Sequence, residues 1–340
     1  MSHRHRNIPL FIPHLGCPNN CIFCNQRSIS GKTAFSLDTV RHDIEQALST
    51  IPDKEDTEIA FFGGSFTGID REDMCALLEI AEEYVRSGRV SSIRLSTRPD
   101  YIDKEVLDIL SSYSVRTVEL GIQSMSDRVL AACRRGHKAS DTVSAAKLLR
   151  EAGFSLVGQM MTGLPEATPE DELDTAQAIC ALGVDAVRIY PTVVLKHTPL
   201  ADDYFAGRYL PPSEEESIAR AADVFDIFKC HRIPVLRIGL QAGEALCKEK
   251  DLVGGFYHEA MGELVEGEWY YRRIKDGLDA CRQEKGVVRI TVPKGKLSLA
   301  IGHRGRNRTR LIKEYPHVTF LFAEDADMIG DAPSVAAASL

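Results

Sequence analysis

The amino-acid sequence predicts an α/β fold, a parallel sheet closed fully or partly into a barrel, with a small α+β segment after it. Three observations lead to this prediction. Short apolar runs alternate with amphipathic helical stretches from residue 8 to about residue 240. The alternation repeats about six times, which is typical of βα units with parallel strands. Beyond residue 240 the pattern changes to glycine-rich and strongly basic stretches.

The expected strands are apolar runs bounded by turn residues, at 9–14, 58–64, 92–97, 116–123, 155–161, 186–191 and 235–239. The expected helices lie between them, at 36–50, 71–88, 138–154, 169–183 and 214–231. Ser36, Asp70 and Ser140 can cap three of these helices, and Pro169 suits the first turn of another. Because ligands gather at the carboxyl ends of parallel strands, we expect functional residues in the loops that follow the strands.

These changes in sequence pattern divide the chain into four expected parts. The core runs over 1–240, and an irregular or helical extension follows over 241–285, with a charged helix expected in WYYRRIKDGLDACRQEK. A small basic segment occupies 286–323. The last part, 324–340, ends in DAPSVAAASL and is expected to be a frayed tail.

Composition excludes several classes of protein. With 44% apolar and 26% charged residues, the chain has the make-up of a globular domain. The first residues, MSHRHRNIPLFIPHLG, lack the apolar stretch and cleavage site of a secretory signal. No run approaches the length of about 18 apolar residues that a membrane span needs. We therefore expect a cytoplasmic protein.

Charge is unevenly distributed along the chain. The whole carries −8, yet residues 287–313 hold eight Lys or Arg and no acidic residue, which leaves −16 on the remainder. A basic segment on an acidic body predicts a local anionic partner, with nucleic acid as the first candidate.

Three of the nine cysteines stand close together, in HLGCPNNCIFCNQ directly after the first expected strand. A zinc site would need a fourth ligand, which His14 would have to supply. An iron–sulfur cluster held by Cys17, Cys21 and Cys24 would keep one iron open for a substrate or cofactor. The spacing favours the cluster over zinc or chance. The other six stand alone in the sequence, and those on apolar helical patterns, such as Cys75 and Cys180, are expected to be small buried side chains; the remaining four are Cys133, Cys230, Cys247 and Cys281.

The Cys-x₃-Cys-x₂-Cys motif, with Phe23 before its last cysteine, resembles the signature of the radical S-adenosylmethionine (radical SAM) superfamily. The resemblance implies a partial (β/α)6 barrel. It also implies a [4Fe–4S] cluster on Cys17, Cys21 and Cys24 that binds S-adenosyl-L-methionine through its open iron. In that superfamily one electron cleaves SAM to methionine and a 5′-deoxyadenosyl radical, which abstracts a substrate hydrogen. An electron donor such as flavodoxin or ferredoxin is then required.

Motifs after the later strands extend this resemblance. FFGGSFT (61–67) resembles the family's "GGE" element, which binds the SAM amino group, and RLSTRPDY (94–101) resembles "ETRPDY" of the Elongator subunit 3 (Elp3) radical SAM domain. ELGIQS with a later RGH resembles "GVQS…RGH", and QMMTGLP (159–165) resembles the turn that closes over the adenosine. Taken from the residues alone, these stretches are equally ordinary turns. By the resemblance, the SAM contacts are Gly63, Gly64, Ser65, Ser96, Gln123, Arg135 and Gln159.

The basic segment contains a G-x-x-G with two basic residues, in LSLAIGHRGRN. Glycines and helix N-termini let phosphates approach the backbone closely. The stretch is similar to a KH repeat of the bacterial transcription factor NusA, so 286–323 is expected to be KH-like. A basic solvated helix is the alternative. The resemblance implies RNA contacts by Gly302, His303, Arg304, Gly305 and Arg306.

Together these features predict an Elp3-like radical SAM enzyme, without the acetyltransferase domain, that modifies RNA, with tRNA as the expected substrate. Two alternatives stay open. One is a radical SAM enzyme on a small molecule, as in the coproporphyrinogen dehydrogenase branch, which fits the acidic body. The other is a non-catalytic iron–sulfur protein that binds RNA.

Overall fold

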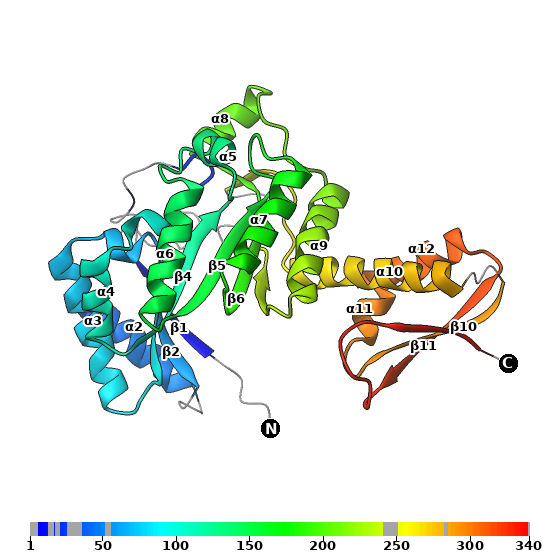
Figure 1. Cartoon of the computed structure of the whole chain (residues 1–340), viewed down its shortest axis with the longest axis horizontal. Coiled ribbons are helices and arrows are strands. Elements are labelled where there is room, and N and C mark those ends of the chain that lie inside the picture. The colour runs from blue at the N-terminus through cyan, green and yellow to red at the C-terminus, as the bar shows by residue number, and fades with distance from the viewer. Residues whose placement is uncertain are drawn as a thin grey trace.

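The computed structural model describes residues 6–12, 17, 21–25, 36–51, 56–240, 251–281 and 285–338. Its centre is a seven-stranded parallel sheet in the order β1-β2-β3-β4-β5-β6-β8, curled into a half-barrel with helices along its outer side (Figure 1). Consecutive strands lie side by side, as repeated βα units dictate. The strands are β1 (Arg6–Ile12), β2 (Thr57–Gly63), β3 (Ser92–Thr97), β4 (Val115–Gln123), β5 (Ser155–Thr162), β6 (Ala186–Pro191) and β8 (Val235–Ile238). All seven expected strands are thus confirmed.

The helices of this part are α2 (Leu37–Thr50), α3 (Arg71–Arg86), α4 (Lys104–Ser111), α5 (Asp127–Ala132), α6 (Ala139–Glu151), α7 (Pro169–Ala181), α8 (Pro199–Phe205) and α9 (Glu214–Cys230). The five expected helices are confirmed within three residues at each end. Ser36 and Asp70 cap α2 and α3 as expected. Ser140 is not a cap: α6 begins earlier, and its capping residue is Lys138, whose N–H donates to Asp141.

The two faces of the curled sheet differ in chemistry. Side chains on its outer face, such as Phe61, Leu95 and Leu120, are fully buried against the helices. Alternate side chains point to the inner face because successive residues of a strand face opposite sides. Several of those are charged, among them Glu58 and Arg94. The half-barrel therefore has an apolar outside and a polar inside.

Helix α10 (Met261–Cys281) connects this core to a second sheet (Figure 1). That sheet has the order β11-β10-β12, with β10 (Gly286–Pro293) parallel to β11 (Val318–Asp325). Between them lie α11 (Leu297–Ile301), a short 3₁₀ turn, and α12 (Arg306–Glu314). This β-α-α-β order is that expected of a KH-like segment. A separate two-stranded antiparallel ribbon is formed by β7 (Val194–Leu195), which follows β6, and β9 (Leu252–Gly254), which precedes α10.

Two boundaries need correction. The helix expected from residue 269 begins at Met261, and its apolar face packs on α9, while residues 241–250 lie outside the described part. The expected tail at 324–340 is wrong over much of its length, because β12 (Ser334–Ala338) pairs antiparallel with β10. Its small residues fit against α10, where a Cβ on Gly277 would lie 2.7 Å from a Val335 methyl group. In the described residues no helix has the length and apolar character needed to cross a membrane.

Candidate functional site

The three spaced cysteines follow β1, at the carboxyl edge of the sheet. Cys21 is buried, and Arg135 Nη1 donates to its Sγ at 3.2 Å. Burial raises the pKa of the Cys17 thiol, while a hydrogen bond with the backbone of Ser65 and the nearby Arg135 charge act in the opposite direction. Cys24 N–H donates to the Cys21 carbonyl at 3.0 Å and closes a turn. For Cys17 the effect of burial is the largest, so the pKa of the free thiol lies above its ordinary value.

Backbone hydrogen bonds hold this loop against three other elements. Ile22 N–H donates to the Cys133 carbonyl at 3.2 Å, after α5, and Leu200 N–H of α8 donates to the Ile22 carbonyl at 2.9 Å. Asn25 Nδ2 donates to the Lys196 carbonyl at 2.8 Å. The Ile22 side chain packs in a small apolar cluster with residues of α5, α8 and β7. The loop is therefore positioned by the fold as well as by any metal it binds.

The two glycines after β2 allow close backbone contact with β1. Gly63 has φ +105°, and a Cβ there would lie 2.6 Å from the Ile12 carbonyl oxygen. Gly64 N–H donates to that same oxygen at 2.9 Å. The Ser65 hydroxyl is buried, accepts from Arg98 N–H at 3.1 Å and lies 2.9 Å from Thr97 Oγ1. Ser65 thus faces the site with its backbone, while its side chain joins β2 to β3.

Gln123 and Arg135 come together over Gly121 of β4. A Cβ on Gly121 would lie 3.2 Å from Gln123 Nε2 and 3.4 Å from Arg135 Nη2. Arg135 Nη2 also donates to the Gly121 carbonyl at 2.6 Å. Gln123 ends the strand with φ +66°, and its buried Oε1 has no hydrogen-bond partner in the described part of the chain. A buried acceptor on strained backbone is a common feature of ligand sites.

Ser96 and Gln159 lie on the inner face of the sheet. Gln159 is the register partner of Gly121, so the structure brings it beside Gln123 and Arg135. Ser96 is the register partner of Glu119, which stands two residues before Gly121, so Ser96 lies nearer the amino ends of the strands. The seven residues expected to bind SAM therefore lie on β2, β3, β4 and β5 and the loops that follow them.

Arg98 and His137 belong to the same site but were not among the expected residues. Arg98 donates to both carboxylate oxygens of Asp100, at 2.9 and 2.8 Å, and to the Arg135 carbonyl. His137 is buried, lies 4.0 Å from Asp100, and neither ring nitrogen has a hydrogen-bond partner in the described residues. Burial, and then the Arg135 charge, lower the pKa of His137 to about 4, so the ring is neutral at pH 7. In the sequence these two residues stand in the short RPD and RGH stretches, but nothing local shows that the two stretches come into contact in the folded chain.

Among the described residues, no three His, Cys, Asp or Glu side chains converge as they would around a single ion. In a four-iron cluster each thiolate binds a different iron, so its ligands need not converge on one point. His14, the fourth ligand that a zinc site would need, lies outside the described residues.

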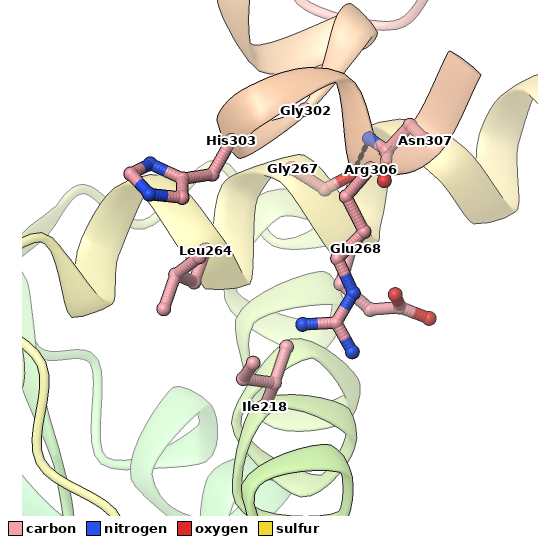
Figure 2. Close-up of a pocket in the computed structure, with 8 residues that line it drawn as sticks. All are labelled: Ile218, Leu264, Gly267, Glu268, Gly302, His303, Arg306 and Asn307. Atoms are coloured by element: carbon pink, nitrogen blue, oxygen red, sulfur yellow. Dashed lines mark hydrogen bonds between the residues drawn. The ribbon is translucent and has the colours of Figure 1, made fainter. Parts of the chain in front are cut away.

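The G-x-x-G loop forms a second region, between α11 and α12. Gly302, Arg304 and Gly305 all have positive φ values, of 82°, 52° and 78°. Asn307 fixes the loop by donating to the Gly267 carbonyl of α10 at 2.7 Å. A small hollow, open to solvent, lies between this loop and helices α9 and α10 (Figure 2). It is lined by Ile218, Leu264, Gly267, Glu268, Gly302, His303, Arg306 and Asn307.

Acidic residues of the core neutralise part of the basic segment. Arg306 lies 3.1 Å from Glu214 and 3.8 Å from Glu215, at the start of α9. Lys296 and Arg310 form ion pairs with acidic residues of α10. Arg304 and Arg308 are exposed. The five residues expected to bind RNA thus lie together, but Arg306 already has an acidic partner.

The family model described as "Radical SAM superfamily" matches residues 11–179, and "Radical_SAM C-terminal domain" matches residues 184–271. An uncharacterized protein of Methanocaldococcus jannaschii is 30% identical over 77% of this chain and 79% of its own length. A tRNA uridine(34) acetyltransferase of Methanocaldococcus infernus is 32% identical, over 38% of this chain and 25% of that enzyme.

Human Elongator complex protein 3 is 23% identical over 71% of this chain and 54% of its own length. The chain therefore spans only about half, or less, of these tRNA-related and Elongator relatives. Among solved structures, archaeal Elp3 of Methanocaldococcus infernus with an N-terminal deletion superposes with a TM-score of 0.57 at 24% identity. The match covers 71% of this chain and 58% of that one, and it shows a shared fold.

Proposed function

Because the chain belongs to the radical SAM superfamily, whose enzymes use a [4Fe–4S] cluster and S-adenosylmethionine, we propose that it modifies RNA, with tRNA as the first candidate. The proposal assigns the cluster to Cys17, Cys21 and Cys24. It assigns SAM to the backbone of 63–65 and to Gln123, Arg135, Gln159 and Ser96. The G-x-x-G loop would then hold the RNA.

The residues of the site fit these two cofactors. Arg135 donates to the Cys21 thiol and its charge acts on the Cys17 thiol, and the buried Gln123 Oε1 offers an acceptor for a polar ligand group. Gly63 lets the end of β2 approach the Ile12 carbonyl of β1, where a Cβ would lie 2.6 Å away, and so sets the path of the 63–65 backbone. When bound, the cofactors supply one-electron chemistry that ends in loss of a substrate hydrogen. This chain's own residues bind and orient them.

One observation carries the choice of RNA: the G-x-x-G loop lies near the carboxyl edge of the sheet, where the cysteines also lie. Gly239, just after β8, is tightly packed against Met261 at the start of α10. His258, three residues earlier, contacts the His303 ring with centroids 5.3 Å apart. An RNA bound at the G-x-x-G loop would therefore lie on the same side of the half-barrel as the proposed SAM site.

Further support comes from relatives and from charge. One relative is named a tRNA uridine(34) acetyltransferase, and Arg304 and Arg308 offer exposed positive charge for phosphates. The proposal includes a small electron-transfer protein such as flavodoxin or ferredoxin as reductant. It also includes a cytoplasmic location, because cysteine ligands need a reducing compartment.

A small-molecule substrate is the second candidate. The ion pairs of Lys296, Arg306 and Arg310 with α9 and α10 reduce the positive charge available to RNA, and the rest of the chain is acidic. RNA binding distinguishes the two candidates.

Replacing Arg304 and Arg308 with Glu is expected to weaken tRNA binding about tenfold and to lower the salt dependence of binding. Both arginines are exposed, whereas Gly302 and Gly305 have positive φ values, so a side chain there would strain the loop itself. Fluorescence anisotropy with labelled tRNA at several salt concentrations measures the effect. Lys147→Glu, on exposed α6, is the matched control. Equal binding by all three proteins would exclude the RNA assignment.

The double substitution Glu214→Gln, Glu215→Gln is expected to tighten tRNA binding about threefold to tenfold, because Arg306 then loses its acidic partners. The same anisotropy assay measures the change, and the salt dependence should become steeper. Glu170→Gln, in the first turn of α7, changes a comparable exposed glutamate and should have no effect. Weaker tRNA binding by the double variant would mean that the ion pair orders the loop for RNA.

A further inference from the structure

The inner face of the half-barrel carries a row of linked charges. Arg94 Nε lies 2.8 Å from Glu58, and its Nη1 lies 2.8 Å from Glu119. Arg188 Nε contacts the other oxygen of Glu119 at 2.9 Å. The side chains of Arg94 and Glu119 are only 8% and 2% exposed. The network crosses four strands, β2, β3, β4 and β6.

Stability alone does not account for this network. Removing two opposite charges from water costs about as much as their attraction returns, and well-packed apolar residues are often as stable. The neighbouring outer face of the same strands is apolar and well packed. The charges therefore call for another role, and the network is suited to hold one member in a fixed orientation.

Arg188 is the member that the network fixes. One edge of its guanidinium binds both oxygens of Glu119, at 2.9 and 3.1 Å. Its face lies over the Phe62 ring, 5.7 Å from the centroid, and it also hydrogen-bonds Tyr190. An arginine held on several sides loses little entropy when it binds a further group.

Arg237 adds a third positive charge beside it. Arg237 is the register partner of Arg188 on β8, is half-buried, and forms no ion pair with any described residue. Three guanidiniums thus accompany two carboxylates, and this end of the inner face has a surplus positive charge. That charge favours an anion.

The row leads directly to the proposed SAM site. Gly121, Gln159, Arg188 and Arg237 are successive register partners across β4, β5, β6 and β8. Gln123 and Arg135 lie over Gly121, at the other end of the row. A group bound at Arg188 and Arg237 is therefore separated from the SAM residues by the width of the strands between them, about 5 Å each.

We propose that Arg188, Tyr190 and Arg237 bind an anionic group of the substrate, a nucleotide phosphate or a carboxylate, beside the SAM site. The inference rests on the proposed radical SAM function and names the charge of the substrate part that enters the half-barrel. A nucleotide phosphate is the form expected for an RNA substrate.

Isothermal titration calorimetry on the cluster-reconstituted protein with SAM tests this, using uridine 5′-monophosphate, uridine and malonate as probes. One or both anions should bind at least tenfold more tightly than uridine. Arg237→Gln should weaken anion binding at least tenfold, and Arg237→Lys should restore much of it. Arg116→Gln, an exposed arginine at the amino end of β4, should bind as the native chain does.

Tighter binding of the nucleotide than of malonate identifies a phosphate site, and the reverse identifies a carboxylate site. If neither anion binds, or if Arg237→Gln binds them normally, the inference is overturned. Because the titration does not involve the G-x-x-G loop or SAM turnover, its failure is distinct from loss of tRNA binding or of SAM cleavage.

Discussion

Cys21→Ser is expected to eliminate the iron–sulfur cluster and to reduce SAM cleavage by at least about a hundredfold, because a serine hydroxyl does not replace a thiolate on iron. The native chain, reconstituted under anaerobic conditions, should hold about four irons per chain. Iron analysis and 5′-deoxyadenosine formation with dithionite measure the two effects.

Cys133→Ala is the matched control for this experiment. Cys133 is fully buried and close to Cys21, yet burial raises the pKa of its thiol to about 12, so it stays protonated at neutral pH. Its contact with the cysteine loop is through its carbonyl, which alanine keeps. The control should therefore bind iron normally. Iron retention by Cys21→Ser, or its loss from Cys133→Ala, would contradict the ligand assignment.

Arg94→Met is expected to lower the free energy of unfolding by about 3–5 kcal/mol, because buried Glu58 loses the cation beside it and Glu119 keeps only Arg188. Chemical denaturation followed by circular dichroism measures the loss.

Arg89→Met provides the comparison for this stability change. Arg89 binds Glu45 through two hydrogen bonds of 2.7 Å, but both side chains are largely exposed. Its loss should cost about 0–1 kcal/mol. Similar losses in the two variants would show that the inner network is well hydrated and would weaken the case for a preorganised Arg188.

The sequence predicted the core well because local signals and tertiary packing agree there. Each of the seven strands is an apolar run that pairs with the strand next to it in the chain order, and helices such as α2 and α3 begin at good caps. Strand β12 has no such local signal. SVAAA is strand only because β10 offers it an edge and α10 leaves room for small side chains.

The candidate site was predictable in part for the same reason. The cysteines and glycines stand in short motifs, so spacing alone identifies them. The bond of Arg98 to the Arg135 carbonyl joins loops 37 residues apart, and the Arg306–Glu214 pair joins residues 92 apart. Contacts over such separations depend on the whole topology, which single motifs do not contain.

Helix α10 has a consequence for which nucleotides could be reached. Its 21 residues span about 31 Å without a break, with Met261 packed on Gly239 of the core and Gly277 packed on Val335 of the small sheet. One continuous helix therefore packs on both parts of the molecule and fixes the distance between them. An RNA bound at the G-x-x-G loop, which packs on Leu264 and Gly267 in the first turns of this helix, would be held at a fixed distance from the half-barrel, so the three-dimensional shape of the RNA would limit which nucleotides enter it.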